Sequence, residues 1–110
     1  MLDVRLYLLQ RLSALVMAPL VIGHIAVMIV AVQGGLTTAE ILSRTQGSVW
    51  WMLFYGLFVV AVSVHAAIGL RVVAYEWLGL KQKLSAVFSI IVFIGLLFLG
   101  IRAVLAVTVS

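Results

Sequence analysis

The sequence predicts an all-α fold, a bundle of three transmembrane helices that forms a single domain over residues 1–110. Of the 110 residues, 66% are hydrophobic and only 9% are charged, whereas soluble domains have about 45–50% and about 25%. The apolar residues gather in three runs, each long enough for the roughly 20 helical residues that cross a bilayer. The runs are residues 12–32, 49–74 and 84–107. This composition excludes a soluble enzyme domain, and the absence of cysteine excludes thiolate-ligated iron–sulfur and zinc sites within this chain.

Each predicted helix is bounded by polar or interfacial residues. The first run follows Arg11 and ends at a Gln-Gly-Gly sequence. The second has aromatic residues at both ends, as is typical of interfacial belts, and the third follows a short turn that contains two lysines. The segment between the first two runs, residues 34–48, is polar, and Thr38 with Glu40 predicts the start of a short interfacial helix there.

The basic residues predict the orientation of the chain in the membrane. With three spans, five of the seven basic residues fall on the side of the N-terminus, and Arg44 and Arg102 fall on the other. The five are Arg5, Arg11, Arg71, Lys81 and Lys83. The positive-inside rule then places the N-terminus in the cytoplasm, for a protein of the bacterial inner membrane, or in the matrix for a mitochondrial one. The first run is longer than a signal peptide and no small-residue cleavage site follows it, so we expect it to be retained.

His24 and His65 are the only ionisable side chains deep within the predicted helices. A polar group at that depth is costly, so each histidine is a candidate functional residue. No carboxylate within the helices is available for a proton relay, which favours metal or haem ligation. The alternative is that both histidines hydrogen-bond to neighbouring helices and contribute only to packing.

The positions of the two histidines along their helices limit how they could bind haem. Counted from the N-terminal side of the membrane, the two imidazoles lie about 10 Å apart in depth. We therefore expect that they are not the two axial ligands of one haem, and that each needs a partner histidine from another chain. The cofactor would be haem b, because the chain lacks a Cys-x-x-Cys-His sequence for covalent attachment.

Small residues on the second and third helices predict the close approach of another helix or of a flat ligand. They are Gly56, Ala61, Gly69, Gly95 and Gly100. Ala61 and Gly69 share a helix face with His65, where they would leave room for a porphyrin. Glycine is also common in membrane helices without any such role.

Two motifs carry a resemblance to a known family. The sequence QRLSA begins at Gln10, and the sequence HAAIGLR begins at His65 and is followed by Glu76. Together with the length and the three spans, they make the chain similar to the membrane-anchor cytochrome b subunits of succinate dehydrogenase and fumarate reductase. The resemblance implies an electron route between an iron–sulfur subunit, paired with a flavoprotein subunit on the cytoplasmic side, and the membrane quinone pool. It also implies a second anchor subunit, or a copy of this chain, as partner.

The resemblance assigns roles to individual residues. The histidine of the family's second span ligates haem b, and His65 matches it. An arginine and a serine at the start of the first span, with an acidic and an aromatic residue after the second, lie near the quinone in that family. The matching residues here are Arg11, Ser13, Glu76 and Trp77. Many relatives have Asp-Tyr in place of the last two, so Tyr75 or Tyr7 would supply the phenol, and His24 resembles the two-haem branch of the family.

The residue types at this membrane level suit quinone chemistry. A quinone that accepts two electrons also takes up two protons, and arginine, hydroxyl and carboxylate groups can balance charge, bond to its carbonyls and pass protons. Arg71 could bond a haem propionate or a lipid phosphate. Arginine and tryptophan are also common interfacial anchors, which leaves a haem-free structural anchor as the alternative. A small cation transporter is set aside, because the three acids, Asp3, Glu40 and Glu76, lie outside the spans.

Overall fold

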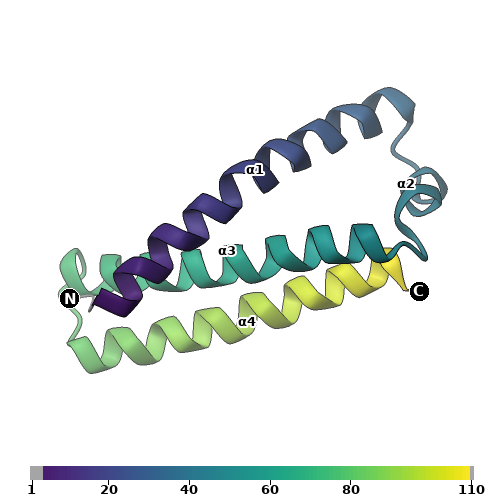
Figure 1. Cartoon of the computed structure of the whole chain (residues 1–110). Helices are drawn as coiled ribbons and strands as arrows, with labels where there is room; N and C mark the ends of the chain where they lie inside the picture. The colour runs from purple at the N-terminus through teal and green to yellow at the C-terminus, as the bar shows by residue number, and fades with distance from the viewer. Residues whose placement is uncertain (1–3, 110) are drawn as a thin grey trace.

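The computed structural model describes residues 4–109, and within this range all regular structure is helical (Figure 1). Asp3, which the sequence places before the first span, lies outside the described residues. The helices are α1 (Val4–Gly34), α2 (Thr38–Thr45), α3 (Val49–Glu76) and α4 (Gln82–Thr108). The predicted all-α class is therefore confirmed.

Three of these helices, α1, α3 and α4, are long and apolar enough to cross a membrane, as predicted. The molecule extends 48 Å along its longest axis, which compares with about 40–45 Å for a bilayer with its headgroups. The predicted apolar span, residues 12–32, lies within α1, which begins eight residues earlier, at Val4. Hydrophobicity marks only the part of a helix inside the bilayer core, whereas the backbone hydrogen bonds of α1 continue through the polar residues near Arg5 and Arg11. At 31 residues, α1 is about 46 Å long and extends beyond a core of about 30 Å.

The predicted short helix is present as α2, although its N-cap is Thr37. The Thr37 side chain accepts a hydrogen bond of 3.2 Å from the backbone N–H of Glu40, which satisfies one of the free donors at the helix start. At the other end, the Thr45 hydroxyl donates to the carbonyl of Val107 at 2.6 Å. The Gly47 N–H also donates to the Thr108 carbonyl, at 2.7 Å. These two bonds attach the end of α2, and Gly47 just after it, to the C-terminal end of α4.

Helix α3 is the central element, because it packs against both α1 and α4. Its contact with α4 is tight at Val59, where a Cβ on Gly100 would overlap the valine methyl groups. Its contact with α1 includes Gly23, where a Cβ would lie 3.3 Å from the Phe54 ring. The buried residues of α3 are mostly small: Ala61, Ser63, Ala67, Ile68 and Ala74. Small side chains let the helix backbones approach, as is typical of helix packing in membranes.

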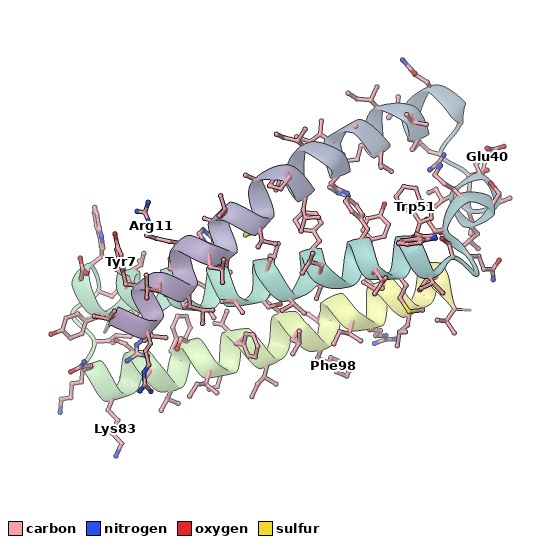
Figure 2. The ribbon with its side chains drawn as sticks, in the orientation of Figure 1. Tyr7, Arg11, Glu40, Trp51, Lys83 and Phe98 are labelled. Carbon is pink, nitrogen blue, oxygen red and sulfur yellow. The ribbon has the colours of Figure 1, made fainter. Side chains whose placement is uncertain are left out.

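The two ends of the bundle differ in the residues they carry. The start of α1 lies beside the turn between α3 and α4, while α2 and the C-terminal end of α4 lie together at the opposite end (Figure 1). Tyr7, Arg11 and Lys83 are at the first end, and Glu40 and Trp51 are at the second (Figure 2). The fold thus sorts the basic residues as the sequence predicted, while the side of the membrane on which each end lies remains a prediction.

Candidate functional site

His65 lies where α1 crosses α3, and its ring meets a buried serine from α1. The Oγ atom of Ser13 is 3.2 Å from Nδ1 of His65. The same hydroxyl donates to the backbone carbonyl of Gln10 at 2.9 Å. Ser13 is 6% exposed, so water does not compete for this contact. This contact uses Nδ1 of the His65 ring and does not involve the other ring nitrogen, Nε2.

Gly69, four residues after His65, faces a side chain of α1. A Cβ on Gly69 would lie 3.5 Å from Nε2 of the Gln10 side chain, so the end of this flexible side chain lies beside the space that the sequence assigned to a porphyrin. At Gly100, the absence of a side chain likewise lets Val59 of α3 pack closely against α4. Gly56 and Gly95 have nothing within 4 Å, so these two remain open to another helix or to lipid. Glycine spacing showed where a close approach is possible and could not show which neighbour makes it.

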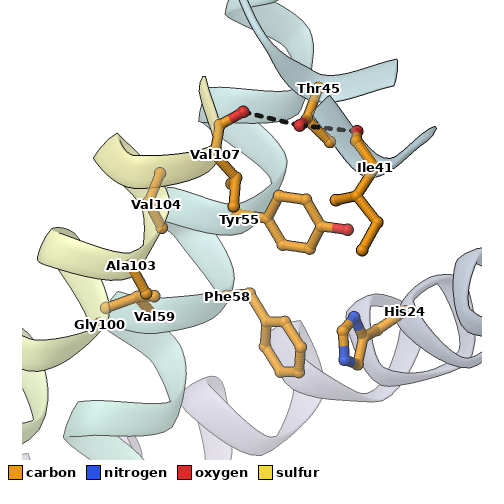
Figure 3. A pocket seen from close by; sticks show the side chains of 10 residues that line it. All are labelled: His24, Ile41, Thr45, Tyr55, Phe58, Val59, Gly100, Ala103, Val104 and Val107. Atoms are coloured by element: carbon orange, nitrogen blue, oxygen red, sulfur yellow. Dashed lines mark hydrogen bonds between the residues drawn. The ribbon is translucent and has the colours of Figure 1, made fainter. Parts of the chain in front are cut away.

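The second histidine, His24, is surrounded by aromatic rings. Its ring meets Phe58 edge-on with centroids 5.3 Å apart, and Tyr55 with centroids 6.1 Å apart. Its Nδ1 atom is buried and has no hydrogen-bond partner among the described residues. The ring lines a pocket of about 290 Å³ to which residues of all four helices contribute (Figure 3). Apart from His24, Tyr55 and Thr45, the lining is apolar.

An aromatic cluster continues from this pocket toward the α2 end of the bundle. Trp51 stacks on Tyr55 with centroids 5.6 Å apart and an angle of 24° between the rings. Phe54 meets both of these rings edge-on. Two of these side chains reach α1, because Phe54 lies against Gly23 and Tyr55 meets His24. Helices α1 and α3 cross at an angle (Figure 1). The sequence singled out Trp51 only as an interfacial residue and gave no role to Phe54 or Tyr55. Their spacing of three and four residues was the signal for a shared helix face.

The two histidines lie at different depths in the bundle. His24 packs against Phe58, and Phe58 precedes His65 by seven residues on α3, or about 10 Å along the helix axis. This agrees with the separation expected from the sequence. Within this chain the two rings therefore do not face each other across a shared metal. The described residues also contain no group of three or more His, Cys, Asp or Glu that could hold a metal ion.

The residues expected near a quinone fall into two sets. Arg11 is exposed, donates to the Tyr7 hydroxyl at 3.4 Å, and places its guanidinium carbon 5.8 Å from the centre of the Tyr7 ring. Tyr75, Glu76 and Trp77 are exposed at the end of α3, which is the end of the bundle that carries Arg11 (Figure 2). Ser13 is the other set, because it faces His65 inside the bundle. Arg71, the residue expected at a haem propionate or a lipid phosphate, is half-buried on α3.

Three apolar helices with a polar contact buried between two of them define a multi-pass helical membrane protein. Residues 1–103 match the model of one protein family, described as the succinate dehydrogenase/fumarate reductase transmembrane subunit. The chain belongs to this family, which confirms the resemblance seen in its two motifs and identifies it as a membrane subunit of such a complex. Neither a curated protein nor a solved structure matched the chain.

Proposed function

We propose that this chain, as a single anchor domain over residues 1–110, is a haem b and quinone-binding subunit of a succinate:quinone oxidoreductase. Its role is to pass electrons between an iron–sulfur subunit and the membrane quinone pool. The observation that supports this most is the setting of His65. Its imidazole contacts Ser13 through Nδ1 at the crossing of α1 and α3, so Nε2 is the ring nitrogen that this contact does not use. Family membership supplies the context of a dehydrogenase complex.

His65 is the residue of this chain that would hold a haem iron at this depth, and haem iron is commonly held by histidine. A second axial histidine would come from a partner anchor chain, either a different subunit or a copy of this one. Arg71 follows His65 by six residues on α3 and is the candidate partner for a propionate. When bound, a haem b supplies a carrier for one electron at a time.

The quinone would bind at the end of the bundle that carries Arg11. Tyr7, Arg11, Tyr75, Glu76 and Trp77 are all exposed there, at the level where lipid tails meet polar loops. Reduction of a quinone consumes two electrons and two protons. The Arg11 guanidinium can balance the charge that accumulates on the quinone oxygens, a tyrosine hydroxyl can donate to a carbonyl, and the Glu76 carboxylate can pass protons from solvent.

The five basic residues at this end favour a cytoplasmic position for it in a bacterial inner membrane. The iron–sulfur subunit, with the flavoprotein subunit beyond it, would dock on the same side, so that electrons pass between it and the haem and quinone through the surface that carries Arg11. The competing function is a structural anchor without haem. In that case, electron transfer to quinone would not depend on either histidine.

A reduced-minus-oxidised absorption spectrum of the intact complex tests this proposal. The wild-type complex should show the bands of a b-type haem, and the His65→Ala complex should lose the main band while the subunits remain assembled on a native gel. His24→Ala is compared with it, because it removes the other imidazole at a different depth and should leave the band of the His65 haem in place. A colourless wild-type complex with all subunits present would rule out the haem assignment.

His24 is the candidate ligand for a second haem, because its Nδ1 is buried without a partner among the described residues and borders a pocket. Unlike Nδ1 of His65, its Nδ1 makes no hydrogen bond to a hydroxyl among the described residues. The ratio of haem to anchor chains decides between the two possibilities. Two haems per anchor pair, with one lost in His24→Ala, would assign His24 as a ligand, and one haem per pair would assign it to packing.

A further inference from the structure

We propose that Ser13 is a positioning residue for His65. Its hydroxyl oxygen accepts a hydrogen bond from Nδ1–H, so that Nε2 is the nitrogen presented to the haem iron. This inference rests on the proposed ligation of haem by His65. It gives Ser13 a different role from the quinone contact that the resemblance implies, because the structure turns the serine toward the inside of the bundle.

The direction of the hydrogen bond follows from the number of protons available. A serine hydroxyl has one proton, and the Ser13 hydroxyl donates it to the Gln10 carbonyl at 2.9 Å. The 3.2 Å contact between Oγ and Nδ1 of His65 can then form only if Nδ1 carries the proton and donates to the serine lone pair. A neutral imidazole has one N–H, so Nε2 is left as a lone pair, which is the form that binds a metal.

The contact also fixes the orientation of the ring. Ser13 is buried, and its carbonyl partner belongs to the helix backbone of α1. The chain of bonds from Nδ1–H to Oγ–H to the carbonyl is anchored at both ends by packed helices, and each bond polarises the next. His24 has no such acceptor, since its Nδ1 is buried without a partner among the described residues.

A hydrogen bond donated by Nδ1 makes the other nitrogen a stronger ligand. Electron density moves from Nδ1–H toward Nε2, which stabilises ferric iron more than ferrous iron. Loss of the Ser13 acceptor should therefore shift the midpoint potential of the His65 haem to a more positive value without removing the haem.

The test is a redox titration of the haem in the assembled complex. Ser13→Thr keeps a hydroxyl and Ser13→Val has nearly the same shape without one, so this pair isolates the hydrogen bond, and Ser13→Ala adds a second hydroxyl-free variant. Ser89→Ala is the matched control, because the Ser89 hydroxyl donates to the Ala86 carbonyl at 2.8 Å with the same spacing of three residues and contacts no histidine.

We expect a positive shift in Ser13→Val and Ser13→Ala at wild-type haem content, and wild-type potentials in Ser13→Thr and Ser89→Ala. Equal potentials in the valine and threonine variants would overturn the proposal. Loss of the assembled complex in both hydroxyl-free variants would also overturn it, because the serine would then support folding. Retention of the main haem band in His65→Ala would instead refute the proposed ligand, which separates the two failures.

Discussion

The surroundings of His65 and His24 differ although both residues lie in apolar stretches of the chain. His65 has a polar contact to Ser13 on a neighbouring helix, at a crossing where Gly69 and Gln10 come close. His24 has aromatic neighbours, a pocket beside it, and a buried Nδ1 without a partner among the described residues. The first imidazole is held in one orientation by a hydrogen bond, whereas the second is held only by packing.

This difference shows what a buried histidine needs in order to act as a preorganised ligand. Leaving a buried polar atom unpaired costs about 1–3 kcal/mol. A hydrogen bond at Nδ1 removes that cost and selects the tautomer that leaves Nε2 free for a ligand. In this chain Nδ1 of His65 has such a partner, and Nδ1 of His24 has none among the described residues. The predictions that follow alter one region at a time, from the largest expected effect to the smallest.

The crossing at Gly69 should be the most sensitive point of the His65 region. Gly69→Leu would push the Gln10 side chain away and separate α1 from α3, and we expect a cost of about 3 kcal/mol, with loss of most of the haem. Gly69→Ala is the control, because its Cβ would meet Gln10 at 3.5 Å, an ordinary contact distance. Thermal stability and the ratio of haem to chain in the purified complex measure both effects. Equal haem content in the leucine variant and the wild type would contradict the importance of this crossing.

A change on the His24 side should reduce stability without affecting the His65 haem. A Cβ on Gly100 would overlap Val59, a stiff β-branched residue that also lines the His24 pocket. We expect Gly100→Ala to cost ~2 kcal/mol through displacement of α4. Gly95→Ala on the same helix has open space and should leave the melting temperature unchanged or raise it. A similar decrease of the melting temperature in both variants would show that alanine destabilises α4 at either position, whether or not it meets Val59.

The smallest effect is expected where α2 closes the end of the bundle. Thr45→Val removes the hydroxyl that donates to the Val107 carbonyl at 2.6 Å, and we expect a cost of about 1 kcal/mol. Hydrogen exchange of the α2 amides should accelerate, while the haem spectrum stays the same. Ser43→Ala is the control, because the Ser43 hydroxyl bonds only to the Glu40 carbonyl within α2, at 2.7 Å. Unchanged exchange in Thr45→Val would mean that other contacts hold α2 in place.

Much of the helical framework could be predicted from the sequence, because hydrophobicity and helix length are read directly from the residues. The three spans, the short helix near Glu40 and the family are all confirmed. Helix α1 begins eight residues before the predicted span, since a helix continues beyond the apolar run that reveals it. The neighbour of Gly69 could not be predicted, because helical spacing identifies a face and not its occupant.

The sequence by itself determined that this chain crosses a membrane three times, that its two histidines lie at different depths, and that its basic residues gather at one end. These features follow from composition and from the fixed rise of a helix. Only the tertiary structure decided that Ser13 meets His65, that Gln10 covers Gly69, and that His24 lies among Phe58 and Tyr55. Contacts between α1 and α3 depend on how the two helices cross, and no spacing along either helix specifies that crossing.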